Sequence, residues 1–208
     1  TLAKDKIGGN WYEIIAILIV ILIVAVLLLF HIDYETYANG AQYISIFLTP
    51  ATVSLAVPLY RQLELLKTYP KAIFGGIIAG VLTAMVSVFA LSLMFGLNHE
   101  QYVTLLPKSI TTAIGMGISE KMGGIVTITV VVIIVTGILG NILADTICHL
   151  CKIEDPIAKG LAIGTSAHAL GTAKAMELGE IEGAMSSLSI VVCGILTVIS
   201  VSIFANFI

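Results

Sequence analysis

Four long runs of uncharged, mostly apolar residues divide the sequence, at 14–30, 72–98, 122–144 and 183–208. A helix needs roughly 20 such residues to cross a hydrocarbon layer of about 30 Å. The first run is the shortest, but tryptophan and tyrosine at positions 11 and 12 precede it, and such amphipathic rings favour the membrane interface. The pattern therefore predicts an all-α polytopic membrane protein.

Composition excludes several other classes of protein. Apolar residues make up 58% of the chain and charged residues 11%, against about a quarter charged in soluble domains. The net charge of −3 and the dispersed lysines and arginines offer no basic face to nucleic acid. We find no nucleophile paired with a base, no phosphate loop and no second cysteine pair beside Cys148 and Cys151. We therefore expect neither an enzyme nor a cofactor nor a metal site.

Three segments between the apolar runs are too polar for ordinary spans and too apolar for loops. They cover about 42–68, 101–121 and 156–178. Within the middle segment, residues 105–117 contain a lysine beside a proline, three hydroxyl residues and two glycines, which cannot face lipid at low cost. It is expected to be either a helix that lines a cavity or a re-entrant helix.

The chain also contains an internal repeat. Residues 80–83 (GVLT) match residues 194–197 (GILT) at an offset of 114, and each half then consists of an apolar span, a polar segment and a second apolar span. This pattern predicts one transmembrane domain, 1–208, with repeat halves at about 12–98 and 124–208 joined by the middle polar segment. If that segment re-enters, the halves are inverted; if it crosses, they are parallel. We favour inversion.

The outer polar segments are interpreted as broken helices. Pro58 suits the first position of a new helix, and Gly171 with Thr172 occupies the matching place in the second half, where a hydroxyl can cap a restarting helix. In a bilayer, such a break is tolerated only beside protein or a wet cavity. Paired breaks whose half-helix N-termini face a carboxylate are typical of secondary transporters.

The sequence therefore predicts a site for a small anion, such as a monocarboxylate. Any one hydroxyl can instead serve close helix packing, His168 can either carry a proton or stay neutral on a carbonyl, and Lys108 can either bind the anion or extend to the headgroups. The candidate substrate-binding residues are Thr52, Ser54, Pro58, Lys108, Ser109, Thr111, Thr112, Thr165, Ser166, His168, Gly171 and Thr172.

Three motifs resemble the LrgB/CidB family of bacterial antiholin-like membrane proteins. They are residues 56–60 (AVPLY), 105–113 (LLPKSITTA) and 155–175 (DPIAKGLAIGTSAHALGTAKA). The resemblance covers essentially the whole chain, and the third motif is long and distinctive. Members of the family usually carry one more hydrophobic helix before the first span, so we expect a segment upstream of Thr1.

The resemblance implies two functions. One is a carrier of small monocarboxylates such as pyruvate, glycolate or glycerate, either with or without coupling to protons. The other is an antiholin-like regulator of murein hydrolase export and cell lysis, which works with a small LrgA/CidA-type membrane partner. Either implies a multi-pass protein of a bacterial or archaeal cell membrane in contact with the lipid bilayer. Runs of small residues such as Gly75 and Gly76 suggest a homo-oligomer, with a dimer expected.

Overall fold

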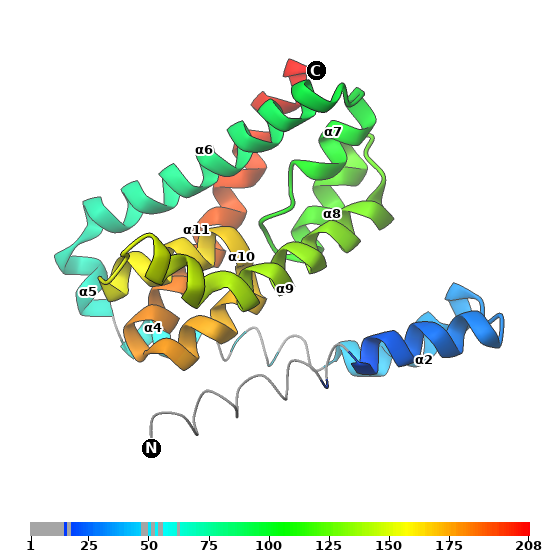
Figure 1. Ribbon diagram of the computed structural model, residues 1–208, viewed down its shortest axis with the longest axis horizontal. Helices are drawn as coiled ribbons and strands as arrows, with labels where there is room; N and C mark the ends of the chain where they lie inside the picture. Colours follow the sequence, from blue (N-terminus) through cyan, green and yellow to red (C-terminus); the bar gives the residue numbers. More distant parts are fainter. Residues whose placement is uncertain (1–14, 16–17, 47–49, 51–52, 54–55, 62) are drawn as a thin grey trace. The chain divides into compact units, whose positions relative to one another are not determined.

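The computed structural model describes residues 15, 18–46, 50, 53, 56–61 and 63–208 (Figure 1). The chain divides into two compact units, Thr1–Thr52 and Val53–Ile208. All regular secondary structure in the described residues is helical. The expected all-α, membrane-type fold is thus confirmed.

The first unit contains an apolar helix, Leu18–Leu29, followed by α2, Tyr34–Ser45. Large apolar side chains on Leu18–Leu29 are exposed, as suits a surface that faces lipid. Asp33 caps α2, because Thr36 donates to the Asp33 carboxylate from its amide at 3.0 Å and from its hydroxyl at 2.7 Å. These hydrogen bonds lower the pKa of Asp33.

The second unit contains most of the described helices. They are α4 (Ala56–Arg61), α5 (Leu63–Thr68), α6 (Pro70–Phe95), α7 (His99–Leu105), α8 (Thr112–Lys121), α9 (Val126–Leu150), α10 (Pro156–Leu178), α11 (Glu180–Phe204) and a final 3₁₀ turn (Ala205–Phe207). Among the described residues, three helices are long and apolar enough to cross a membrane: Pro70–Phe95, Val126–Leu150 and Glu180–Phe207. They correspond to the last three predicted spans.

Local sequence explains where α6 and α7 begin and end. Pro70 lies in the first turn of α6, where its missing amide hydrogen costs nothing. Gly96 ends α6 in the left-handed conformation, with φ of 63°. Asn98 and Gln101 then form a capping box, in which each side chain accepts a hydrogen bond from the other's backbone amide. The chain therefore turns sharply between α6 and α7.

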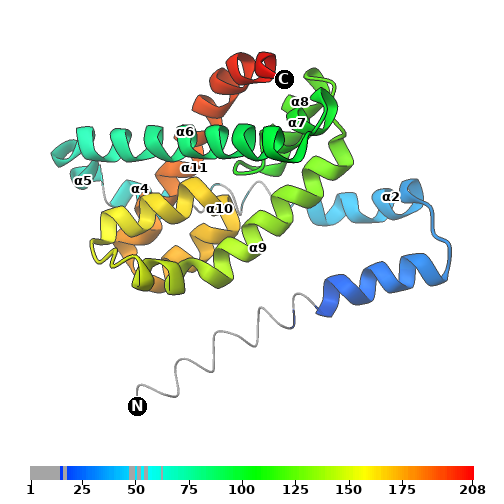
Figure 2. The same ribbon diagram turned by 45° about the horizontal axis from the view of Figure 1, so that its top comes forward.

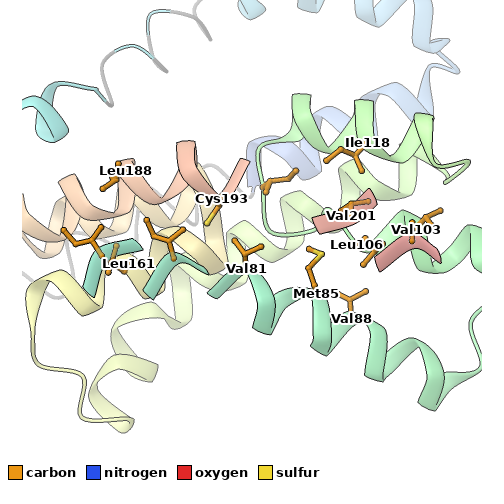
Figure 3. Packing of buried hydrophobic residues seen from close by; sticks show 14 of the residues in the cluster. Val81, Met85, Val88, Val103, Leu106, Ile118, Leu161, Leu188, Cys193 and Val201 are labelled. Carbon is orange, nitrogen blue, oxygen red and sulfur yellow. The ribbon is translucent and has the colours of Figure 1, made fainter. Parts of the chain in front are cut away.

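The hydrophobic core lies between α6, α11 and α7. Val81, Met85 and Val88 follow one face of α6, and Figure 3 shows them next to Cys193 and Val201 of α11. This spacing of three and four residues places one side of the helix against its neighbour. The core therefore holds α6 against α11.

The middle polar segment forms two short helices, α7 and α8, separated by a turn at 106–111. The seven residues of α7 rise about 10 Å and the ten of α8 about 15 Å, so neither crosses a layer of about 30 Å. A buried hydroxyl network ties them to α9: Thr129 Oγ1 donates to Thr104 O at 2.9 Å and lies 2.7 Å from Ser119 Oγ. Lys108 and Ser109 lie in the turn that this network supports.

Candidate functional site

The helix α10 is interrupted at His168. This residue has φ of 42° and ψ of −135°, whereas a helical residue has a negative φ near −63°. The chain reverses at this point: a Cβ atom placed on Gly171 would lie 2.9 Å from Ile163 Cγ2. Eight residues of straight helix would separate these positions by about 12 Å. The two parts of α10, residues 156–167 and 169–178, therefore fold back on each other.

Contacts with α11 show the directions of the two parts. Along the first part, Gly160 meets Glu182 and Gly164 meets Ser186, so both residue numbers rise together. Along the second part, Thr172 Oγ1 lies 2.7 Å from Ser186 Oγ, whereas the later Met176 meets the earlier Gly183. The first part runs with α11 and the second runs against it. Thus α10 is a helical hairpin with His168 at its tip (Figure 2).

The hairpin corrects one prediction. The sequence placed the break at 169–172 with Thr172 as a cap, but the structure places it at His168. Thr172 instead donates to His168 O at 3.0 Å and pairs with Ser186, both fully buried. Gly171 lies in the first turn of the second part, where the absence of a side chain lets the chain fold back on Ile163. The lack of a side chain at Gly171, rather than its backbone flexibility, therefore explains why a glycine occupies this position.

His168 faces α9. Its Nε2 atom lies 3.0 Å from Ile133 O, and its side chain is 5% exposed. Gly137 lies against the ring, since a Cβ atom there would be 2.8 Å from His168 Cε1. Of the two roles considered for His168, this geometry matches the histidine that bonds to a carbonyl.

The corresponding break in the first half falls largely outside the described residues. Thr52 and Ser54 both lie there, so their predicted roles stay predictions. Pro58 lies near the start of α4, which is described from Ala56 onward. The early part of a helix tolerates proline because its amide groups have no partner within the helix.

A cavity of about 610 Å³ lies between α6, the first part of α10 and the α7–α8 turn. Four predicted residues line it: Lys108, Ser109, Thr165 and Ser166. Five others do not line it, although they are described: Thr111, Thr112, His168, Gly171 and Thr172. The cavity follows the first part of α10 and includes no residue of the second, so the predicted half-helix N-terminus does not contribute to it.

Lys108 provides the positive charge of this cavity. Its Nζ atom donates to Ser109 Oγ at 3.0 Å, which leaves the Ser109 hydroxyl hydrogen free to donate in turn. Within the described part of the chain, no carboxylate lies within ion-pair distance of Lys108. Lys108 is half-buried, so its charge is only partly compensated by solvent. An anion is the natural partner.

The hydroxyl residues of α10 contribute less than the sequence suggested. Thr165 donates to Leu161 O at 2.8 Å, and Ser166 donates to Ala162 O at 2.7 Å. Because a hydroxyl has a single hydrogen, these groups are donors to their own helix and offer only acceptor lone pairs to the cavity. The donors that α10 and the α7–α8 turn offer to the cavity are therefore the Lys108 ammonium and the Ser109 hydroxyl.

The α6 wall of the cavity was not predicted from the sequence. It is formed by small residues and two hydroxyl residues: Ala72, Gly76, Ala79, Gly80, Thr83, Ala84 and Ser87. Small residues on one helix face allow close helix approach, and the spacing of Gly76 and Gly80 could have indicated this. Asp155, at the start of α10, also lines the cavity and was not proposed as a site residue.

The α6 and α11 helices, which correspond in the repeat, run in the same direction. Gly76 meets Leu161 and Gly80 meets Thr165, so α6 runs with the first part of α10, as α11 does. Beyond the C-terminal ends of both, His99 Nδ1 lies 2.6 Å from Ile208 O. The inverted arrangement that we favoured from the sequence is therefore not confirmed.

Curated proteins of several bacilli are similar to this chain. A Bacillus subtilis (strain 168) protein named "Uncharacterized protein YxaC" is 39% identical over 85% of this chain and 76% of its own length. "Antiholin-like protein LrgB" of Bacillus cereus (strain B4264) is 39% identical over 84% of this chain and 76% of its own length. The Bacillus anthracis (strain CDC 684 / NRRL 3495) protein of the same name gives the same values. No solved structure matches the chain.

A comparison with protein families agrees with the similarity to these relatives. The model of the LrgB-like family matches residues 5–207, which include the hairpin, the α7–α8 turn and the cavity that they border. The chain therefore belongs to the LrgB-like family of membrane proteins.

Proposed function

We propose that this protein is a secondary transporter of small monocarboxylates in the bacterial cell membrane. The observation that carries the proposal is the cavity in which Lys108 lies without a carboxylate partner in the described residues. A buried or half-buried charge is unfavourable without a counter-ion, so the site favours an anion. The volume of about 610 Å³ is within the range of small-molecule sites and is large enough to admit a small organic acid.

The hairpin supports transport in a second way. The first part of α10 has twelve residues and rises about 18 Å, less than a hydrocarbon layer of about 30 Å. Interrupted helices beside a polar cavity are a recurring feature of secondary transporters. Irregular backbone inside a membrane has unpaired polar groups, so it must contact protein or a water-filled cavity. In this proposal the hairpin forms one wall of the substrate site and α6 forms the other.

Uptake into proteoliposomes tests the proposal. The protein would be reconstituted without a partner, and uptake of radiolabelled pyruvate and glycolate would be measured with and without a proton gradient. Transport predicts uptake above that of empty vesicles and loss of uptake with Lys108→Gln. No uptake under any of these conditions, including with the small partner co-reconstituted, would contradict it.

The comparisons favour a second candidate function more directly than they favour transport. Relatives at 39% identity are named antiholin-like protein LrgB. We propose on that basis an antiholin-like regulator of murein hydrolase export and cell lysis, which acts by assembly with a small LrgA-type membrane protein and with copies of itself. The exposed apolar side chains of α6, α9 and α11 provide helix surfaces for lipid or for such partners.

Variants of the cavity separate the two functions. Regulation through assembly predicts that Lys108→Gln leaves a lysis phenotype intact, whereas bulky substitutions on an exposed helix face, such as Leu93→Trp, alter it. Transport predicts that Lys108→Gln alters the phenotype and that Leu93→Trp leaves it intact. Lysis would be measured by complementation of a strain that lacks its own homologue, with the amount of protein in the membrane as the control.

A further inference from the structure

Asp155 and Lys108 are the charged residues among the described residues that line the cavity, and they have opposite signs. Asp155 precedes α10, where its carboxylate accepts a hydrogen bond from Ala158 N at 2.9 Å. Lys108 lies in the turn between α7 and α8. The cavity therefore carries one positive and one negative charge on separate elements.

The two charges approach the cavity from different ends. α6 and the first part of α10 run in the same direction, and α7 begins just beyond the C-terminal end of α6. The α7–α8 turn thus enters from the C-terminal side of these helices (Figure 1). Asp155 lies at the N-terminal end of α10. The small residues of α6 and the apolar residues of α10 separate them.

We infer that Asp155 weakens the binding of anions that carry a second charge and so favours monoanions in the cavity. This inference rests on the proposed transport function and deepens it. A monoanion pairs with Lys108 and can place an uncharged end toward Asp155. A dianion must place its second carboxylate in a cavity with no second cation among the described lining residues and with a carboxylate at the opposite end. Repulsion by Asp155 thus acts on the second charge.

The size of the effect follows from Coulomb's law. Across a separation of about 12 Å, at an effective dielectric constant of about 20, repulsion by one charge would lower affinity about tenfold. Asp155 is exposed, so salt reduces this value, and we expect the Asp155 charge to lower the affinity for a dianion by about threefold to tenfold at low ionic strength.

The test compares two acids of nearly equal size, malonamate with one charge and malonate with two, at pH 7.5. Binding of each to the purified full chain in detergent would be measured by calorimetry. Asp155→Asn is the informative variant, because asparagine caps a helix about as well as aspartate and removes only the charge. Glu154→Gln is its matched control, since Glu154 is the neighbouring acid and does not line the cavity.

Asp155→Asn is expected to raise the affinity for malonate relative to malonamate by about threefold to tenfold over the wild type, and Glu154→Gln is expected to leave this ratio unchanged. High salt should reduce the difference between Asp155→Asn and the wild type. An unchanged ratio in Asp155→Asn, an equal change in Glu154→Gln, or binding of neither acid would overturn the inference. Binding without uptake into proteoliposomes would instead overturn only the transport function.

Discussion

Thr172 Oγ1 and Ser186 Oγ lie 2.7 Å apart, fully buried, and join the second part of the α10 hairpin to α11. Thr172 also reaches His168 O at the tip, so this hydroxyl pair connects the backbone reversal to the helix that runs beside it. Thr172→Val keeps the shape of the side chain and leaves Ser186 without this partner. We expect it to lower the free energy of unfolding by about 1 kcal/mol.

Denaturation in mixed micelles, followed by circular dichroism, would measure this loss. Thr172→Ser retains the hydroxyl and is the control, which should lose less stability than Thr172→Val. Equal stability of Thr172→Val and the wild type would show that the hydroxyl pair does not support the hairpin.

The glycines that face α11 should be intolerant of a side chain. A Cβ atom on Gly164 would lie 2.6 Å from Ser186 O, a backbone atom that can move only if α10 and α11 separate. We expect Gly164→Ala to destabilise the protein by about 1–3 kcal/mol, as overpacking generally does. Gly75→Ala is the control in α6, because no atom lies within 4 Å of its Cβ position.

The control should behave in the opposite way. Alanine is favoured over glycine inside a helix by about 1 kcal/mol, so Gly75→Ala should leave the protein unchanged or more stable. Thermal unfolding of both variants in the same detergent would make the comparison. A stable Gly164→Ala protein would contradict the close approach of α10 and α11.

The backbone conformation of His168, at the tip of the hairpin, leads to another prediction. His168 has a positive φ, which glycine adopts freely and β-branched residues rarely adopt. His168→Gly loses the contact with Ile133 O but keeps the backbone conformation, whereas His168→Val loses both. We expect His168→Val to be less stable than His168→Gly by about 1 kcal/mol or more.

Membrane expression and unfolding temperature of the two variants would be compared with those of the wild type. Ala169 follows the tip in the second part of α10, and Ala169→Gly and Ala169→Val serve as the matched pair there. If valine were no worse than glycine at 168, the backbone reversal would not be located at this residue.

Lys108 should control anion affinity. Lys108→Gln removes the charge but keeps a hydrogen-bond donor, and we expect a loss of at least about tenfold in affinity for pyruvate. Lys108→Arg keeps the charge and should retain more of the affinity. Equilibrium binding to the purified protein checks both, with Lys121→Gln, an exposed lysine that does not line the cavity, as the control. Equal affinity of Lys108→Gln and wild type would remove Lys108 from the site.

The sequence by itself determined the helical, membrane-type fold. Uncharged runs such as 126–144 have too few polar groups for any other environment. It also indicated that the motif around His168 interrupts a helix. These conclusions depend only on residues that are close together in the sequence, so the sequence alone is enough to reach them.

Only the tertiary structure decided that α10 folds back at His168 and that the cavity includes Lys108 and Asp155 but not Thr172. Residues 108 and 155 belong to different elements, and nothing local brings them to one cavity. Their placement depends on glycines that let α10 approach α6 and α11, and on the Thr104–Thr129 hydrogen bond that supports the α7–α8 turn. Such long-range contacts are set by the packing of whole helices, whose directions no local pattern fixes.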